Sequence, residues 1–142
     1  MAAPSARRGF TLVELVVVVA LAALLAAVAL PAYTQHLAAG RRADAVAALM
    51  QLQMAQERHH GNHGVYAGDR AALRGAGTAV SAQGFYDITL APLPDAPGQG
   101  YVAEAVPRAN GPQSRDSECP RLTLTVRHGI AAQGPHRRCW LS

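Results

Sequence analysis

The chain has 142 residues, half of them hydrophobic, and its formal net charge of +4 rests on 13 arginines with no lysine. Covalent assembly through lysine amines is therefore excluded, and so small a positive excess does not by itself indicate nucleic-acid binding. The sequence also lacks a Ser/His/Asp order with supporting motifs, a phosphate-binding loop and a complete zinc-ligand set. These absences predict a protein that is not an enzyme and has no cofactor.

The N-terminal segment joins a short basic leader to a long apolar stretch. Arg7 and Arg8 precede Gly9, and residues 10–30 are almost entirely apolar, with one carboxylate at Glu14. As a helix this stretch would reach about 31 Å, which matches the roughly 30 Å hydrocarbon core of a membrane. A carboxylate at the centre of such a helix costs roughly 2.5–3.5 kcal/mol, so Glu14 indicates a partner or a function.

Two other interpretations of this segment stay open. A secretory signal peptide would share the basic residues and the apolar core, and the Ala-Val-Ala at residues 27–29 would serve as its cleavage site. A plain membrane anchor would need only the apolar stretch. Glu14 argues against the signal peptide, because such signals normally lack an acid in the first turns of the apolar core.

The string Gly-Phe-Thr-Leu-Val-Glu at residues 9–14 resembles the class III signal of type IV prepilins, and Pro31 and Tyr33 extend the match. The resemblance implies that a prepilin peptidase/methyltransferase cleaves between Gly9 and Phe10 and methylates the new amino group of Phe10. It implies that Glu14 guides assembly with other pilin subunits on an inner-membrane platform. It also implies a single-pass location in the inner membrane, followed by a periplasmic and cell-surface pilus.

Physical chemistry gives Glu14 a role consistent with that resemblance. Cleavage would leave a positive amine on Phe10, one helical turn from Glu14. In a bundle of such helices, Glu14 of one subunit can meet the amine of a neighbour. Desolvation offsets much of this attraction, so the pair would set the register rather than supply net stability. The apolar helix faces would supply most of the assembly energy through packing.

One long helix of about 50 residues is predicted, because no strong stop signal occurs between Phe10 and Gly61. Pro31 should kink it, since proline lacks the amide donor and crowds the preceding turn. Beyond the membrane part the pattern is amphipathic, and Met50 and Met54 are expected to pack against a sheet. The apolar face contains Leu37, Ala38, Ala45, Ala48, Leu49, Leu52 and Ala55, and the wetter faces contain Arg41, Arg42, Gln51, Glu57 and Arg58.

The remainder of the chain reads as a loop followed by short strands. After a loop to about residue 83, strands are predicted at residues 85–90, 101–106 and 122–126, with a turn at Gly129. A fourth strand is expected either near Ile130 or at residues 139–141. Successive strands with short links predict an antiparallel sheet laid on the helix, an α+β fold. The expected division is a leader at 1–9, a transmembrane and assembly helix at 10–32, and a globular domain at 33–142.

The two cysteines, Cys119 and Cys139, have nineteen residues between them. After export they would meet an oxidising compartment, where a disulfide worth roughly 3 kcal/mol is expected. A metal site with His128 and His136 of the enclosed loop is the alternative. The strand order and the terminal cysteine extend the resemblance to the whole type IV pilin plan, and most closely to minor pilins of the PilE type.

Three groups of polar residues have several interpretations. His59 and His63 have the spacing of paired metal ligands, and His60 lies between them, but no acid or cysteine completes a site, so no metal is predicted. Asp116 and Glu118 read as ordinary loop acids. A basic cluster near the C-terminus would either contact DNA phosphates or form a solvated face; it contains Arg127, Arg137 and Arg138 with His128 and His136.

The sequence therefore predicts a structural subunit of a type IV pilus, a minor pilin, that is cleaved, N-methylated and assembled through its N-terminal helix. Two alternatives remain. One is a pseudopilin of a type II secretion system, and the other is a DNA-binding competence pilin. The sequence leaves the role of the fibre open among adhesion, twitching motility and DNA uptake.

Overall fold

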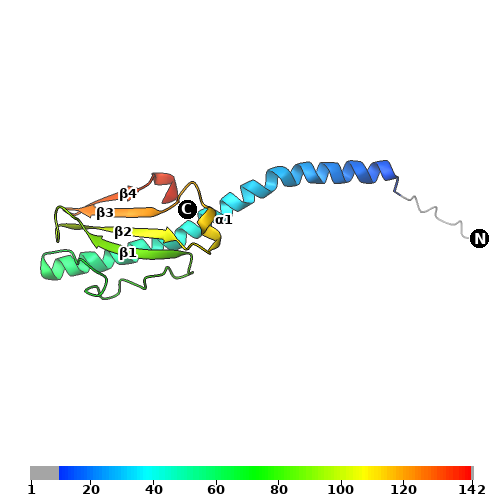
Figure 1. Cartoon of the computed structure of the whole chain (residues 1–142). Helices are drawn as coiled ribbons and strands as arrows, with labels where there is room; N and C mark the ends of the chain where they lie inside the picture. The colour runs from blue at the N-terminus through cyan, green and yellow to red at the C-terminus, as the bar shows by residue number, and fades with distance from the viewer. Residues whose placement is uncertain (1–9, 142) are drawn as a thin grey trace, which may run out of the picture. The chain divides into compact units, whose positions relative to one another are not determined.

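The computed structural model describes residues 10–141, so the expected leader, with Arg7, Arg8 and Gly9, lies outside the described part. It consists of one long helix followed by a four-stranded sheet, which confirms the predicted α+β fold (Figure 1). The chain divides into two compact units between His36 and Leu37. The elements are α1 (Leu12–His63), β1 (Tyr86–Pro92), β2 (Gly100–Pro107), η1 (Pro112–Arg115), β3 (Leu122–Arg127), β4 (Ile130–Gly134) and η2 (Arg137–Cys139).

Local hydrogen bonds account for both ends of α1. At its start the amide of Glu14 donates to the hydroxyl of Thr11 at 3.3 Å, the arrangement of an N-cap. At its end Gly64 has a positive φ of 76°, and its amide donates to the carbonyl of His60 at 2.7 Å. The helix thus ends at His63, within the predicted stop at residues 61–64, and its 52 residues agree with the predicted length of about 50. Pro31 lies inside α1 without ending it, and the expected kink there stays a prediction.

The sheet is antiparallel with the strand order β1-β2-β3-β4. Residues 122–127 and 130–134 form a hairpin whose two turn residues, His128 and Gly129, both have positive φ, as a tight right-twisted hairpin requires. This strand confirms the expectation near Ile130. The alternative strand at residues 139–141 is wrong, because the chain forms the short helix η2 there.

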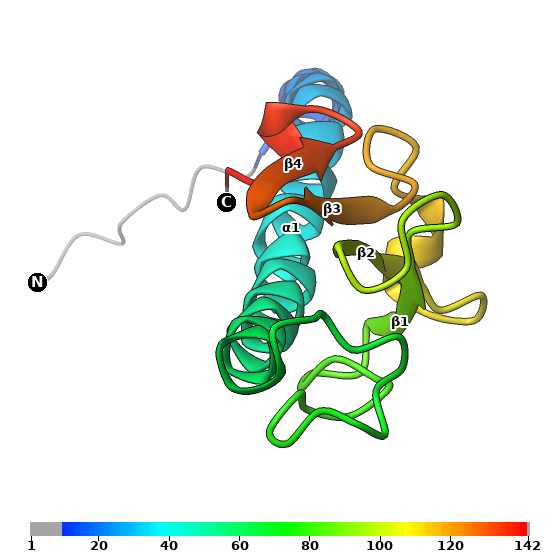
Figure 2. The ribbon, with the colours of Figure 1, turned by 90° about the vertical axis from the view of Figure 1, so that its left-hand side faces the viewer.

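One face of the sheet packs on the second half of α1 and forms the core of the C-terminal unit (Figure 2). Along each of the first three strands alternate residues are buried, which is the period-2 pattern of a half-covered sheet. The side chains buried between α1 and the sheet include Ala45, Leu49, Leu52, Tyr86, Ile88, Tyr101, Ala103, Leu122, Leu124 and Val126.

Two residues of α1 lie on faces that the sequence analysis did not predict. Met50 packs against the core as expected, but Met54 is 56% exposed. It follows the buried Leu52 by two residues, and this places it on nearly the opposite side of the helix. Arg42, expected on a wet face, is buried. It precedes Ala45 by three residues and therefore lies on the same stripe as the core residues.

Candidate functional site

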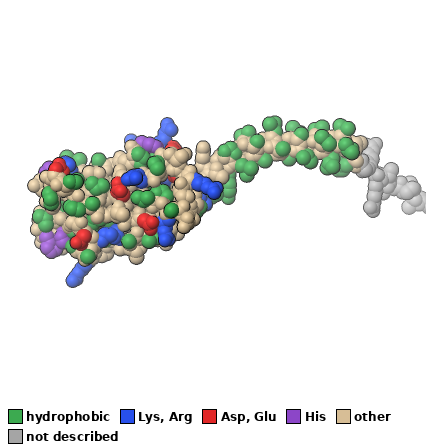
Figure 3. Space-filling model, viewed as in Figure 1, with side chains coloured by type: hydrophobic (Ala, Val, Ile, Leu, Met, Phe, Trp, Pro, Cys, Tyr) green, Lys and Arg blue, Asp and Glu red, His purple; other side chains and the backbone are tan. Residues whose placement is uncertain are grey.

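The described part of the N-terminal unit is a helix with an exposed apolar surface. Every described side chain from Phe10 to His36 is exposed. Hydrophobic side chains cover the visible side of this unit in Figure 3. The helix is long and apolar enough to cross a membrane. An uncovered apolar surface of this kind requires a lipid bilayer or packing against other helices.

Glu14 sits in the first turn of this apolar helix, three residues after its N-cap Thr11. A Thr at the N-cap and a Glu three residues later form the sequence of a capping box. Glu14 therefore has a local structural role available beside the assembly role predicted for it. The two roles depend on different properties of the side chain. Capping requires a side chain that can form hydrogen bonds, whereas pairing with an amine requires a negative charge.

In the C-terminal unit a buried ion pair joins α1 to the segment that follows η1. The guanidinium of Arg42 donates from Nε to Asp116 Oδ2 and from Nη2 to Asp116 Oδ1, both at 2.7 Å. A third bond runs from Nη2 to Glu118 Oε2 at 2.9 Å. The side chains of Arg42 and Asp116 are only 7% and 3% exposed. Glu118 is 50% exposed, so the strong partner is Asp116.

Further hydrogen bonds fix the carboxylate of Asp116. The amide of Gln113 donates to Asp116 Oδ2 at 2.7 Å and to the carbonyl of Ala38 in α1 at 3.1 Å. Burial alone would raise the pKa of Asp116, but the hydrogen bonds from Arg42 and the backbone amide of Cys119 outweigh it and lower that pKa. The same pairing raises the pKa of Arg42, so both groups are ionised at neutral pH. Asp116 is thus not the ordinary loop acid that the sequence analysis expected.

The predicted disulfide is present between Cys119 and Cys139, with the two Cα atoms 5.8 Å apart. The amide of Cys119 donates to Asp116 Oδ1 at 3.2 Å, so the disulfide and the buried ion pair share one anchor. His136 lies 3.6 Å from Cys139 Sγ, but a disulfide sulfur is not the thiolate that a metal binds. The structure therefore favours the disulfide over the metal alternative in this loop.

The three arginines predicted as DNA contacts differ in their surroundings. Arg127, at the end of β3, donates to both carboxylate oxygens of Asp95 at 2.8 and 3.1 Å. This pairing lowers the pKa of Asp95 and neutralises the charge of Arg127. Arg137 and Arg138 lie on η2 next to Cys139, are exposed, and take part in no ion pair within residues 10–141. Of the three arginines, only Arg137 and Arg138 carry a positive charge that no acid within residues 10–141 neutralises.

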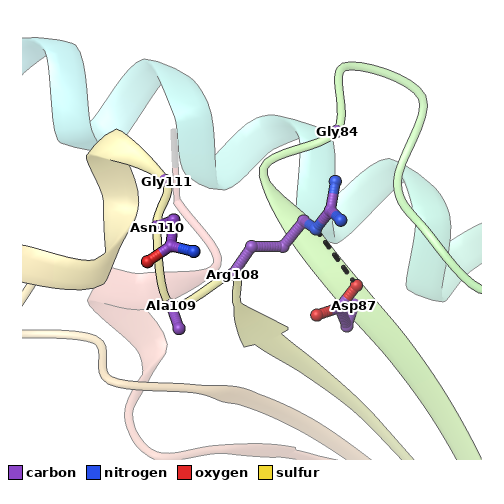
Figure 4. A pocket seen from close by; sticks show the side chains of 6 residues that line it. All are labelled: Gly84, Asp87, Arg108, Ala109, Asn110 and Gly111. Carbon is purple, nitrogen blue, oxygen red and sulfur yellow. Dashed lines mark ion pairs between the residues drawn. The ribbon is translucent and has the colours of Figure 1, made fainter.

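A recess of about 410 Å³ beside β1 illustrates the same neutralisation. Arg108 and Asp87 lie side by side in its lining and form an ion pair at 3.4 Å (Figure 4). Gly84, Ala109, Asn110 and Gly111 complete its lining. Because the acid neutralises the arginine, this recess offers no net charge for a ligand.

Two family models match the chain. A family model described as "Type IV minor pilin ComP, DNA uptake sequence receptor" matches residues 31–123, and a "Prokaryotic N-terminal methylation motif" matches residues 4–30. The chain belongs to the type IV minor pilin family. No solved structure matches it significantly.

Among curated proteins, this minor pilin is similar to pilins and fimbrial proteins of two genera. It is 35% identical to "Type IV major pilin protein PilE" of Neisseria gonorrhoeae over 80 residues, which is 56% of this chain and 47% of the relative. "Fimbrial protein EcpC" of Eikenella corrodens is 36% identical over 105 residues, 74% of this chain and 65% of the relative. The chain thus spans less than two thirds of these relatives' lengths.

Proposed function

We propose that this minor pilin is cleaved between Gly9 and Phe10, N-methylated on Phe10, and assembled into a type IV pilus through its N-terminal helix. The observation that carries the proposal is an uncovered apolar helix with one carboxylate in its first turn, inside the matched methylation motif. Before assembly the bilayer would cover this surface, and in the fibre the helices of other subunits would do so. The partners are then other pilins, the prepilin peptidase/methyltransferase and the inner-membrane assembly platform.

Glu14 is proposed to pair with the N-terminal amine of a neighbouring subunit and thereby set the register of the fibre. The capping role offers a competing explanation for a glutamate at this position. Glu14→Gln separates the two, because glutamine keeps the hydrogen-bonding side chain of a capping box but removes the charge.

The test counts this subunit in pili sheared from host cells that carry Glu14→Gln, with Thr11→Val as the matched change that removes the cap and keeps the charge. The proposal predicts that Glu14→Gln is processed but depleted from the fibre, while Thr11→Val still enters it. Normal incorporation of Glu14→Gln, with loss of Thr11→Val, would refute the pairing role.

DNA binding is a second candidate function, and we propose that Arg137 and Arg138 carry it. The description of the matched family, a DNA uptake sequence receptor, supports DNA binding as a function, although the matched residues 31–123 do not include these two arginines. What supports Arg137 and Arg138 themselves is that they are exposed and form no ion pair within residues 10–141. Arg127 is a weaker candidate because Asp95 already holds it. A pseudopilin gains no such support, since the relatives named above are pilins and fimbrial proteins.

Binding of duplex DNA, measured by fluorescence anisotropy over a range of salt concentrations, tests this candidate. Changing Arg137 and Arg138 together to alanine should weaken binding and flatten the dependence of log affinity on log salt by about 0.9 for each phosphate that the protein no longer neutralises. Arg127→Ala is the matched control, and it should change the DNA affinity and its dependence on salt much less. If the double variant binds like the wild type, the basic pair is only a solvated face.

A further inference from the structure

The end of α1 carries two imidazole rings in direct contact. His59 and His63 are one helical turn apart, and their ring centroids lie 4.1 Å from each other with the planes at 18°. Both line a recess of about 530 Å³ together with Asn62, Arg58 and Arg74. His63 is exposed and His59 half-buried, so both rings remain reachable from solvent.

A backbone contact determines which nitrogen of His63 is available. Its Nδ1 lies 2.9 Å from the carbonyl oxygen of His59. A carbonyl oxygen only accepts, so Nδ1 carries the proton and donates, and in the neutral ring Nε2 then carries the lone pair. Metal-binding histidines in proteins are held in the same way, with the second ring nitrogen donating to a carbonyl or a carboxylate.

The third histidine of this helix end is turned away from the pair. His60 stacks against the buried Tyr66, with ring centroids 4.3 Å apart. It therefore packs on a different side of α1 and is not part of the recess lining. The helix end therefore contains one pair of potential metal ligands, His59 and His63. It also contains a third histidine, His60, whose ring does not face the pair and which can serve as a control.

We propose that His59 and His63 form a two-histidine site for a divalent transition metal, in which Nε2 of His63 and a ring nitrogen of His59 bind the ion. Two histidines at positions i and i+4 of one helix face are a recurrent metal-binding arrangement. The nitrogens must approach the ion to about 2.0–2.1 Å, which requires the ring of His59 to turn out of the stack while the carbonyl contact holds the ring of His63. The negative end of the helix dipole also favours a cation here.

The other residues of the recess predict which ions bind and how tightly. Its lining contains no acid, and the guanidinium groups of Arg58 and Arg74 repel a dication. The site should therefore prefer ions with high affinity for neutral imidazole, in the order Cu²⁺ above Ni²⁺ and Zn²⁺. The positions of the ion that the two rings leave open would be filled by water.

Calorimetric titration of the full-length chain in detergent with CuCl₂, NiCl₂ and ZnCl₂ tests the proposal, with protein made without a polyhistidine tag. One equivalent should bind, with Cu²⁺ tightest. His59→Ala and His63→Ala should each weaken Cu²⁺ binding by about tenfold or more, because either change removes the chelate. His60→Ala, which removes the same side chain from the same helix end, should leave the affinity unchanged.

Arg74→Gln distinguishes this metal site from an anion site in the same recess. Removal of the positive charge should tighten Cu²⁺ binding. The proposal is overturned if the wild type binds no metal, or if His60→Ala weakens binding as much as His59→Ala. It is also overturned if the protein binds inorganic phosphate, Arg74→Gln weakens that phosphate binding, and the metal affinity is the same in His59→Ala and His63→Ala as in the wild type.

Discussion

The buried ion pair between Arg42 and Asp116 should be a principal determinant of the stability of the C-terminal unit. Arg42→Met keeps an unbranched side chain on the apolar stripe of α1 but removes three hydrogen bonds of 2.7–2.9 Å. It leaves the carboxylate of Asp116 buried, with only Gln113 and the amide of Cys119 as donors. Breaking a buried pair by removing one partner costs about 3–5 kcal/mol. Because two donors remain, we expect a loss of about 3 kcal/mol.

Urea unfolding of the full-length chain in detergent, followed by the fluorescence of Trp140, measures this loss. Trp140 is the single tryptophan and is buried beside the disulfide, so it reports on the C-terminal unit. Arg127→Met is the matched control, because it breaks an arginine–aspartate pair of similar length at an exposed site. Exposed pairs contribute little, so this control should unfold close to the wild type.

A second variant tests whether charge is the cause. Asp116→Asn on top of Arg42→Met removes the stranded charge and keeps an oxygen that Gln113 or the amide of Cys119 can donate to. The double variant should therefore be more stable than Arg42→Met alone. The reasoning would be refuted if Arg42→Met unfolds at the same urea concentration as Arg127→Met, or if Asp116→Asn adds a further loss.

Three other changes probe the same unit by urea unfolding. The pKa of Asp116 is lowered in the folded state, so its contribution to stability should be fully present above the unfolded value of 3.8 and should be lost as the pH falls through the lower folded value. If Arg42→Met loses stability in acid to the same extent as the wild type, this reasoning is contradicted. Replacing Cys119 and Cys139 by serine should lower the free energy of unfolding by roughly 3 kcal/mol. If the wild type unfolds at the same urea concentration with and without reductant, the disulfide does not contribute this stability. Gly100→Ala should prevent stable folding, because a Cβ there would overlap the carbonyl oxygen of Val126 on the neighbouring strand. Gly61→Ala has open space around it and should stabilise α1 by up to about 1 kcal/mol. If the two variants change stability by similar amounts, the packing argument is refuted.

Periodicity and composition were enough to predict the main elements of this fold. The unbroken apolar and amphipathic pattern predicted α1, and the alternation in residues 122–126 predicted β3. The disulfide followed from two cysteines in an exported chain. These features are local or depend on one pairing, so the sequence shows them directly.

The buried polar cluster was not predicted, because its partners are distant in sequence. Arg42 and Asp116 are 74 positions apart, and nothing local to either one indicates the other. One signal was present: Arg42 falls on the helical stripe of Ala45, Leu49 and Leu52, where an exposed side chain is not expected. The pairing of Arg127 with Asp95, which alters its value as a DNA contact, also becomes visible only in the folded chain.

The intact mass and N-terminal sequence of the processed protein, purified from its own host, test the central claim most directly. The account predicts a mature chain that begins with N-methylated Phe10, one methyl group heavier than the residues from Phe10 onward. A chain that begins at Leu30, after the Ala-Val-Ala at residues 27–29, would mean ordinary secretion of the C-terminal unit. It would contradict assembly through the N-terminal helix and the role proposed for Glu14.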